Sequence, residues 1–306
     1  MMQSIRSGVY PTMITPYTKD NMLDLDAVGQ LVEYYAQCDC EGIFALCLSS
    51  EIFHLSDEEK RTLLRSVLSV NAGRMQIVAS GHTADDLNSQ IRQLAMTVEE
   101  GADAAVMILN RTAKPDESED VCRHNIEKLL NALPDVRFGI YECPYPYKRV
   151  ASPELMRWCA QTGRIVFIKD TCCDLASIQA KQQAVQGTPL KIFNANTATL
   201  LASMRLGVEG FSGIMANFHA DLYTLLIRLM KADDPAAETL QAYLTMASWI
   251  ENMLYPVCAK AYRALQGMSI TTVTRTKDAS AWTATNAAEI QQLHTLEQAV
   301  RSRLFA

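Results

Sequence analysis

The sequence predicts an α/β fold, a TIM (β/α)8 barrel with a C-terminal helical appendage. Short apolar runs typical of buried strands alternate eight times with amphipathic helical patterns before residue 220. The remaining residues carry almost no strand pattern and show the apolar spacing of helices. No Gly-x-Gly-x-x-Gly motif follows the first apolar run, which argues against a dinucleotide-binding sheet. We therefore expect a barrel over residues 1–220 that carries the active site, and a helical region over residues 221–306 packed on it.

The expected strands are short apolar runs, several of them rich in β-branched residues. In chain order they cover residues 8–14, 42–48, 75–79, 103–109, 136–141, 165–169, 190–193 and 208–212. The sixth begins with four consecutive apolar residues, which is typical of a strand buried on both faces.

The expected helices follow these strands. Ser56 and Glu59 form a capping box, and Ser152 with Pro153 marks a second helix start. Asp170 is expected to cap the helix after the sixth strand, with Asp174 as another capping residue. The helical patterns cover residues 24–37, 56–70, 83–100, 117–132, a stretch from 152 onward, 221–231, 236–253, 257–266 and 287–304.

Composition and charge exclude several classes of protein. The chain is 49% hydrophobic and 20% charged, with a net charge of -6 from dispersed acidic residues. We therefore expect no nucleic-acid partner and no membrane-binding patch. No apolar run is long enough to span a bilayer, and residues 1–8 lack the apolar core of a signal peptide, so we expect a cytoplasmic protein. The nine cysteines are expected to be reduced thiols, because their spacing does not suit a structural zinc site.

Lys169 follows the buried sixth strand directly, and this placement has two interpretations. The lysine can extend from the rim of the strand into water. Alternatively it is a catalytic amine, because an ammonium against apolar walls loses hydration, its pKa falls, and the free amine attacks a ketone.

Active residues of a barrel lie at the carboxyl ends of its strands. Tyr141 ends the strand before Lys169, so the two side chains should emerge about 5 Å apart on adjacent strands. Such an amine and phenol suit an imine-forming reaction, in which the phenol moves protons. Ser49 and Ser50 are expected to bind a carboxylate, which suggests an α-keto acid substrate. The other candidate substrate contacts at strand ends are His82, Ala195 and Ser212, and His82 suits a structural role equally well.

Several motifs, taken in their order along the chain, resemble those of a known family. They are Gly8 to Pro16, Glu51 with Leu55-Ser56-Asp57-Glu58-Glu59, Tyr141-x-x-Pro144, Ile168-Lys169-Asp170, Gly210 to Asn217 and Tyr255-Pro256-Val257-x-x-Lys260. Over essentially its whole length the chain resembles the dihydrodipicolinate synthase / N-acetylneuraminate lyase family of class I pyruvate-dependent aldolases. The resemblance implies that Lys169 forms the Schiff base with pyruvate and that Tyr141 shuttles protons. It also implies an aldehyde partner, a homotetramer or homodimer, and no metal or organic cofactor, because the iminium is the electron sink.

The chain departs from the family pattern at three places. Leu48 replaces a relay hydroxyl, Thr112 lies near the position of a tyrosine that reaches a neighbouring subunit, and Pro146 replaces the arginine that holds the acceptor's carboxylate. We expect Lys148 and Arg149, just beyond, to be solvated at the rim, and Glu51 to be a structural carboxylate that binds loop amides.

These features predict a lyase or aldolase that joins or cleaves pyruvate and a neutral aldehyde. The alternatives are a genuine 4-hydroxy-tetrahydrodipicolinate synthase and a catalytically weak keto-acid-binding homologue. A metal-dependent aldolase is disfavoured, because no cluster of histidine and glutamate gathers at the strand ends.

Overall fold

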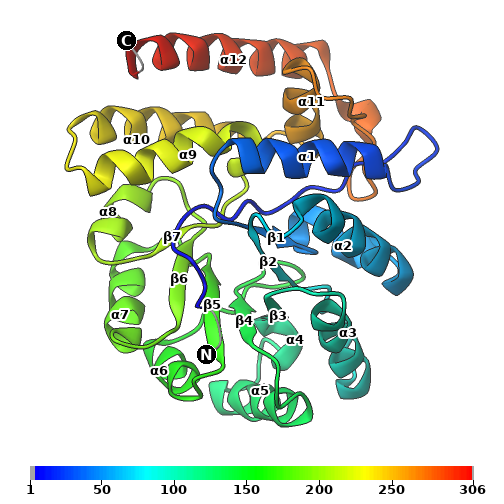
Figure 1. The fold of residues 1–306 in the computed structure, drawn as a ribbon, viewed down its shortest axis with the longest axis vertical. Coiled ribbons are helices and arrows are strands. Elements are labelled where there is room, and N and C mark those ends of the chain that lie inside the picture. Colours follow the sequence, from blue (N-terminus) through cyan, green and yellow to red (C-terminus); the bar gives the residue numbers. More distant parts are fainter. Residues whose placement is uncertain (1–3, 305–306) are drawn as a thin grey trace.

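Every strand of the sheet pairs in parallel with the next strand along the chain, and the sheet curls into a barrel (Figure 1). The computed structural model describes residues 4–304. The strands in this part of the chain are β1 (Gly42–Ala45), β2 (Gln76–Ala79), β3 (Ala104–Ile108), β4 (Phe138–Tyr141), β5 (Ile165–Asp170), β6 (Lys191–Asn194) and β7 (Gly210–Phe211). The parallel α/β barrel predicted from the sequence is confirmed.

Residues 8–13 close the barrel between β7 and β1, although they do not form the regular first strand that the sequence predicts. Two isolated parallel bridges, Val9 with Phe211 and Thr12 with Phe44, join this segment to both edges of the sheet. Pro11 has no backbone N–H to donate, so a continuous ladder cannot form there. Its carbonyl still accepts a hydrogen bond from Phe44 N at 2.9 Å.

Gly210 marks the closest approach in this closure. A Cβ atom at this position would lie 2.0 Å from the carbonyl oxygen of Gly8 and 2.9 Å from the ring of Phe193. Only a residue without a side chain lets the two backbones approach this closely.

Helices cover the outside of the barrel (Figure 1). They are α1 (Leu25–Gln37), α2 (Asp57–Asn71), α3 (Leu87–Glu99), α4 (Leu109–Thr112), α5 (Glu119–Ala132), α6 (Pro153–Gln161), α7 (Leu175–Val185) and α8 (Leu200–Arg205). The capping box of Ser56 and Glu59 is confirmed at the start of α2, and Ser152 accepts a hydrogen bond from Leu155 N at the start of α6.

Two helix starts around the barrel differ from the prediction. Asp86 caps α3, so this helix begins at Leu87 rather than at residue 83. The expectation that Asp170 caps the next helix is wrong, because Asp174 caps α7 and accepts a hydrogen bond from Ser177 N at 2.7 Å. Asp170 is the last residue of β5 and binds a buried lysine instead.

The appendage consists of α9 (Ala216–Lys231), α10 (Ala236–Ala247), the 3-10 helix η3 (Ser248–Asn252), α11 (Val257–Leu265), the 3-10 helix η4 (Ala279–Ala281) and α12 (Ala284–Leu304). In Figure 1, α9 and α10 lie side by side, and α12 crosses above them at the opposite end of the molecule from α5. The predicted boundary at residue 220 falls inside α9, so the chain passes from barrel to appendage within one helix.

The barrel interior is filled by aromatic rings. Phe167 stacks on Phe193 with ring centroids 4.7 Å apart, and Phe44 packs edge-on against Phe167 and Tyr141 at 5.8 and 5.4 Å. Side chains alternate across a strand, so Phe167 and Lys169 of β5 share the inner face. The rings therefore form a dry floor beneath Lys169.

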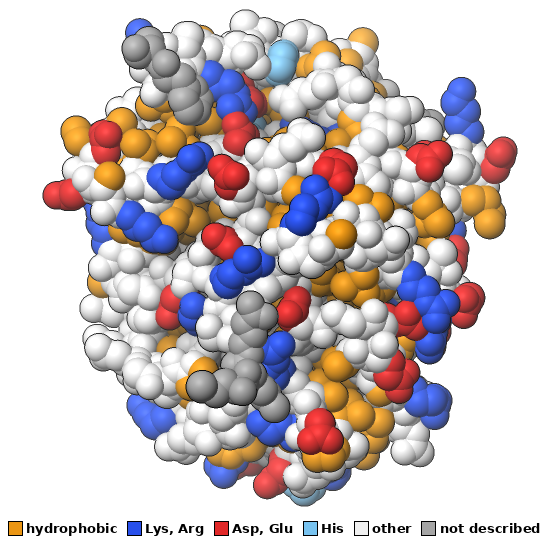
Figure 2. Space-filling view, in the orientation of Figure 1, with side chains coloured by type: hydrophobic (Ala, Val, Ile, Leu, Met, Phe, Trp, Pro, Cys, Tyr) orange, Lys and Arg blue, Asp and Glu red, His pale blue; other side chains and the backbone are white. Residues whose placement is uncertain are grey.

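The visible face of the surface carries charges of both signs (Figure 2). Figure 2 shows basic and acidic side chains interspersed over the visible face. Within residues 4–304, no helix combines the length and apolar character needed to cross a membrane.

Candidate active site

A cavity of about 530 Å³ lies at the carboxyl ends of the strands. Lys169 and Tyr141 line it from the barrel, together with residues of the loops that follow β1, β4 and β6. The appendage contributes Glu251 of η3, and the chain before η4 contributes Thr276 and Lys277. The cavity is thus enclosed by both regions of the chain.

Lys169 and Tyr141 are direct partners in the register of β4 and β5. The Lys169 Nζ atom lies 4.7 Å from the centroid of the Tyr141 ring. Both residues are almost fully buried, with 4% and 2% of their surface exposed. The structure therefore brings together the amine and the phenol that the sequence places on adjacent strands.

Burial shifts the pKa values of both groups. Burial lowers the pKa of Lys169, while the Glu251 carboxylate works in the opposite direction. No hydrogen bond or ion pair of Lys169 Nζ is formed within residues 4–304, so nothing but the Tyr141 ring holds the amine. Burial raises the pKa of Tyr141 well above its ordinary value, so this phenol keeps its proton at neutral pH.

Ser49 and Ser50 lie in the 3-10 helix η1 (Leu48–Ser50) but face different ways. Ser49 lines the cavity, and its hydroxyl donates to Thr12 Oγ1 at 3.2 Å. Ser50 does not line it, because its hydroxyl donates to the carbonyl of Met13 at 2.7 Å and accepts from Cys47 N at 3.2 Å. Only Ser49 is thus placed to meet a substrate carboxylate.

Of the remaining predicted contacts, Ala195 lines the cavity, whereas His82 and Ser212 lie outside it. His82 Nδ1 accepts a hydrogen bond from Ile108 N at 3.0 Å, and burial lowers the pKa of this imidazole to about 4. The hydroxyl of Ser212 is fully buried and finds no partner within the described residues. The structure thus brings together Lys169, Tyr141, Ser49 and Ala195.

A family model described as the dihydrodipicolinate synthetase family matches residues 6–286. The chain belongs to the dihydrodipicolinate synthetase family. This family comprises class I pyruvate-dependent lyases and aldolases, and the resemblance seen in the sequence is confirmed.

The relatives of this family member carry two different activities. The chain is 25% identical over 264 residues to the 4-hydroxy-tetrahydrodipicolinate synthase of Mycolicibacterium paratuberculosis, with 86% of each chain covered. It is 24% identical over 220 residues to the N-acetylneuraminate lyase of Rhizobium meliloti, with 72% of this chain and 71% of the lyase covered. Sequence similarity therefore places the chain in the family without choosing one of these activities.

The fold agrees with solved structures of the family. It matches YagE, a prophage protein from E. coli K12 whose structure is in complex with pyruvate, with a TM-score of 0.86, 20% identity, and 96% and 98% of the two chains covered. It also matches dihydrodipicolinate synthase DapA-2 from Bacillus anthracis with a TM-score of 0.85, 18% identity, and 96% and 98% covered.

The loop after β4, where the chain departs from the family pattern, differs in part from our expectation. Lys148 is exposed, as expected, but it also lines the cavity, where its Nζ atom donates to the carbonyl of Thr171 at 2.7 Å. The cause is Asn110, whose side-chain amide donates to three carbonyls between residues 143 and 147 and folds the turn back. Arg149 points elsewhere and donates to the carbonyl of Glu117 at 2.8 Å.

Sequence reasoning missed Glu251, which reaches the cavity from η3. Burial raises the pKa of this carboxyl to about 6, and Lys169 opposes the rise. Glu251 follows no strand, so a search of strand ends cannot find it. The nearest signal in the sequence is the family motif that starts at Tyr255, a residue that also lines the cavity.

Glu51 has the structural role that the sequence predicts. Its carboxylate accepts hydrogen bonds from Arg275 N and Thr276 N at 2.6 and 2.9 Å and from Thr274 Oγ1 at 2.6 Å. Lys260 Nζ lies 3.2 Å from the same carboxylate. Glu51 thus fixes the chain that brings Thr276 to the cavity.

A buried ionic cluster supports the reactive pair from the outer side of the strands. Glu142 and Asp170 follow Tyr141 and Lys169 in the chain, so they face away from the barrel interior. Lys181 of α7 lies 2.6 Å from the Glu142 carboxylate and 2.5 Å from that of Asp170. None of these three side chains is exposed. They join the ends of β4 and β5 to α7.

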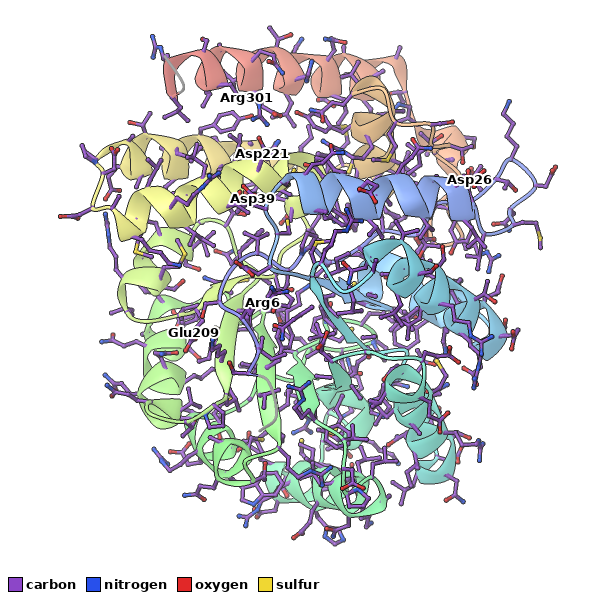
Figure 3. The ribbon with its side chains drawn as sticks, viewed as in Figure 1. Arg6, Asp26, Asp39, Glu209, Asp221 and Arg301 are labelled. Atoms are coloured by element: carbon purple, nitrogen blue, oxygen red, sulfur yellow. The ribbon has the colours of Figure 1, made fainter. Side chains whose placement is uncertain are left out.

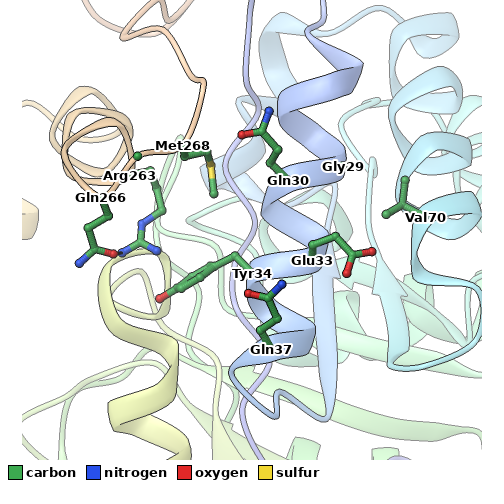
Figure 4. A pocket seen from close by; sticks show the side chains of 10 residues that line it. Gly29, Gln30, Glu33, Tyr34, Gln37, Val70, Arg263, Gln266 and Met268 are labelled. Carbon is green, nitrogen blue, oxygen red and sulfur yellow. Dashed lines mark hydrogen bonds between the residues drawn. The ribbon is translucent and has the colours of Figure 1, made fainter.

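A second cavity of about 560 Å³ lies outside the barrel, between α1 and α11 (Figure 4). Its buried cation, Arg263, donates to Gln266 Oε1 and to the carbonyl of Phe218, and its guanidinium lies 4.0 Å from the centroid of the Tyr34 ring. This arginine is already bound by its own chain, and the reactive pair lies in the first cavity.

Proposed function

We propose that this protein is a Schiff-base-forming lyase or aldolase that joins or cleaves pyruvate and an aldehyde through an imine on Lys169. The observation that carries this proposal is the buried Lys169 amine, which has no hydrogen-bond acceptor within the described residues and lies against the Tyr141 ring. The pyruvate in the YagE structure and the names of the curated relatives support the same chemistry.

The reaction follows from the groups in the cavity. The free amine attacks the keto carbon of pyruvate, the carbinolamine loses water, and the iminium draws electrons from the neighbouring carbon. Loss of a methyl proton gives an enamine, which attacks the aldehyde carbon while the aldehyde oxygen takes up a proton. Tyr141 keeps its own proton at neutral pH, so it can donate one to the departing hydroxyl. Ser49 is placed to bind the carboxylate. No step requires a metal.

Borohydride trapping tests the imine. Pyruvate and borohydride should add a reduced three-carbon adduct to Lys169 in the native protein, and EDTA should leave this adduct unchanged. Lys169→Ala should abolish it, whereas Lys148→Gln, which changes another lysine of the same cavity, should keep it. An adduct that survives Lys169→Ala would refute this mechanism.

The proposed acceptor is a neutral aldehyde, because Pro146 replaces the arginine that, by the family resemblance, binds the acceptor's carboxylate in related synthases. The wall near this loop is aromatic, with Phe53 and Tyr145 packed edge-on at 5.1 Å between ring centroids. Both hydroxylated sugar-derived aldehydes and aromatic aldehydes suit such a wall.

A second candidate is 4-hydroxy-tetrahydrodipicolinate synthase itself, and Lys148 on the cavity wall favours it. Its ammonium can replace the missing arginine as a cation for the carboxylate of aspartate semialdehyde. The test compares two values of kcat/KM, one for the reaction of pyruvate with aspartate semialdehyde and one for its reaction with glyceraldehyde. A roughly tenfold advantage for the semialdehyde, lost in Lys148→Gln but kept in Lys114→Gln at an exposed site outside the cavity, would establish the synthase.

A further inference from the structure

Two glutamates line the active cavity, and only one of them is occupied by structural contacts. Glu51 binds Lys260, two backbone amides and a threonine hydroxyl, as described above. Glu251 forms no hydrogen bond or ion pair within residues 4–304. A partly buried carboxyl that faces a reactive amine without a structural partner is a candidate for proton transfer.

The proposed reaction contains a step that such a second group can take. Tyr141 starts protonated at neutral pH and gives its proton to the departing hydroxyl, and removal of the methyl proton from the iminium is a separate step that uses a base. Leu48 lines the cavity near Tyr141 and brings no hydroxyl. Glu251 lies on the appendage side of the cavity, across from the strand ends that carry Lys169 and Tyr141.

We propose that Glu251 is a second catalytic acid–base residue of this site, acting on the pyruvate-derived intermediate bound to Lys169. This inference rests on the proposed function. The Glu251 carboxylate removes a methyl proton from the iminium, and the electron pair of that C–H bond forms the enamine. The protonated carboxyl then gives this proton to the aldehyde oxygen as the new carbon–carbon bond forms. In the cleavage direction the same two transfers run backwards.

The surroundings of Glu251 suit this cycle. Burial raises the pKa of the carboxyl to about 6, so both protonation states are populated near neutral pH. Besides Lys169, the charged or ionisable groups that line this cavity are His54, Lys148, Cys173, Lys277 and the phenols of Tyr141, Tyr145 and Tyr255, with Glu51 already neutralised by Lys260.

The helices packed against η3 are α10 and α11. Their charged side chains Glu238, Lys260 and Arg263 are bound to Arg205, Glu51 and Gln266 respectively. Tyr223 of α9 and Cys258 of α11 lie within electrostatic reach of Glu251. Burial raises the pKa of Tyr223 well above its ordinary value and that of Cys258 to about 12, so both stay protonated. The pKa of Glu251, about 6, thus places its change of charge near neutral pH.

The test compares Glu251→Gln with the wild type in two assays, after circular dichroism has established that the variant is folded. Borohydride trapping of pyruvate on Lys169 should proceed as in the wild type, whereas kcat should fall by about 10²-fold or more. The acidic limb of the kcat/KM profile near pH 6 should disappear. Glu238→Gln, an exposed carboxylate of α10 outside the cavity, should change neither assay.

Chemical rescue distinguishes proton transfer by Glu251 from an indirect effect of Glu251 on the pKa of Lys169. Formate added to Glu251→Ala should restore part of the lost turnover, because a small carboxylate can occupy the vacated space. Unchanged kcat and an unchanged acidic limb in Glu251→Gln would overturn the inference, and so would a trapping rate that falls as far as turnover does. A wild type that forms no adduct at all would instead refute the proposed function.

Discussion

The position of Lys169 inside the barrel depends on the alternation of side chains along β5. Phe167 and Lys169 face the interior, whereas Ile168 and Asp170 face the helices. A register slip of one residue would turn Lys169 toward α7 and place Asp170 over the aromatic floor. The paired register of Tyr141 with Lys169 therefore fixes the amine, the phenol and the ionic cluster behind them at once.

Tyr141→Phe should separate proton transfer from binding. The ring and its 4.7 Å contact with Lys169 Nζ remain, so pyruvate should still be trapped on Lys169. Turnover should fall by about 10²-fold or more, because the phenolic proton is lost. Tyr145→Phe, at an exposed tyrosine of the same cavity, is the matched control and should keep turnover close to wild type. Borohydride trapping of pyruvate and steady-state turnover assays are applied to both variants. Equal turnover in Tyr141→Phe and Tyr145→Phe would contradict the role of Tyr141 in proton transfer.

Sequence patterns could predict residues on the strands or directly after them, and not those that more distant segments bring to the cavity. Lys169 and Tyr141 follow apolar runs whose period fixes where each side chain points. Lys148 reaches the cavity only because Asn110, far away in sequence, folds its turn. His82 was a candidate on the same strand-end rule, but its imidazole binds the backbone of Ile108.

At the scale of elements, local signals fixed most helix starts because the capping residue acts within one turn. The Ser56 box and the Ser152 cap were visible in the sequence and are present. The first strand was expected to be regular, but Pro11 reduces it to two bridges. The helix expected from residue 221 matches the regular part of α9, and the turn from Ala216 that precedes it is separated by a kink at His219, whose φ is -145°.

The ionic cluster of Lys181, Glu142 and Asp170 joins two strands to one helix, so it should be costly to break. Lys181→Met removes the cation and leaves two carboxylates buried side by side. We expect the free energy of unfolding to fall by about 3–5 kcal/mol, as for other buried pairs that lose one partner. Urea denaturation at neutral pH measures this loss. Lys128→Met, at an exposed lysine of α5, is the control, and a loss for Lys181→Met no larger than for this control would contradict the structural role.

A second polar cluster attaches α12 to the appendage. Arg301 of α12 binds Asp221 of α9, and both are labelled in Figure 3. Within the same cluster, Glu297 lies 3.0 Å from His219 Nδ1, and Tyr262 OH donates to it. Burial alone would raise the pKa of Glu297, but these hydrogen bonds and the charge of Arg301 hold it at about 2.

The lowered pKa makes the contribution of Glu297 depend on pH. A carboxyl whose pKa falls on folding stabilises the protein above its unfolded pKa, and this stability is lost as pH falls toward the folded value. Glu297→Gln should therefore lower the free energy of unfolding by on the order of 3 kcal/mol at pH 7. The difference from wild type should shrink as pH falls from about 4.5 toward 2. Urea denaturation across this range measures it, with Glu289→Gln, an exposed carboxylate of α12, as control. A difference that grows on acidification would contradict the assignment.

At the scale of the whole molecule, we expect the chain to assemble as a homotetramer, or at least a homodimer. Exposed apolar side chains suited to an interface include Trp249 and Met246 of the appendage, with 69% and 67% of their surface exposed. Multi-angle light scattering at micromolar concentration measures the mass in solution. A mass near that of one chain would contradict the prediction, whatever the activity.

Within such an assembly, each active site should work independently. Thr112 is buried in its own subunit, where its hydroxyl donates to the carbonyl of Leu109 at 2.7 Å and lies 3.0 Å from Cys122 Sγ. It therefore cannot extend toward a neighbouring site.

Mixed oligomers of wild-type and Lys169→Ala subunits test this independence. If every site is complete within one chain, activity should rise in direct proportion to the fraction of wild-type subunits. If Thr112 of one subunit supplied an essential group to the site of its neighbour, altering Thr112 in the inactive subunits would also impair wild-type sites. Activity would then rise more steeply than in proportion to the fraction of wild-type subunits. The stringent version therefore pairs wild type with a Lys169→Ala, Thr112→Ala double variant and should give the same straight line. Curvature that appears only with the double variant would show that Thr112 acts across the interface.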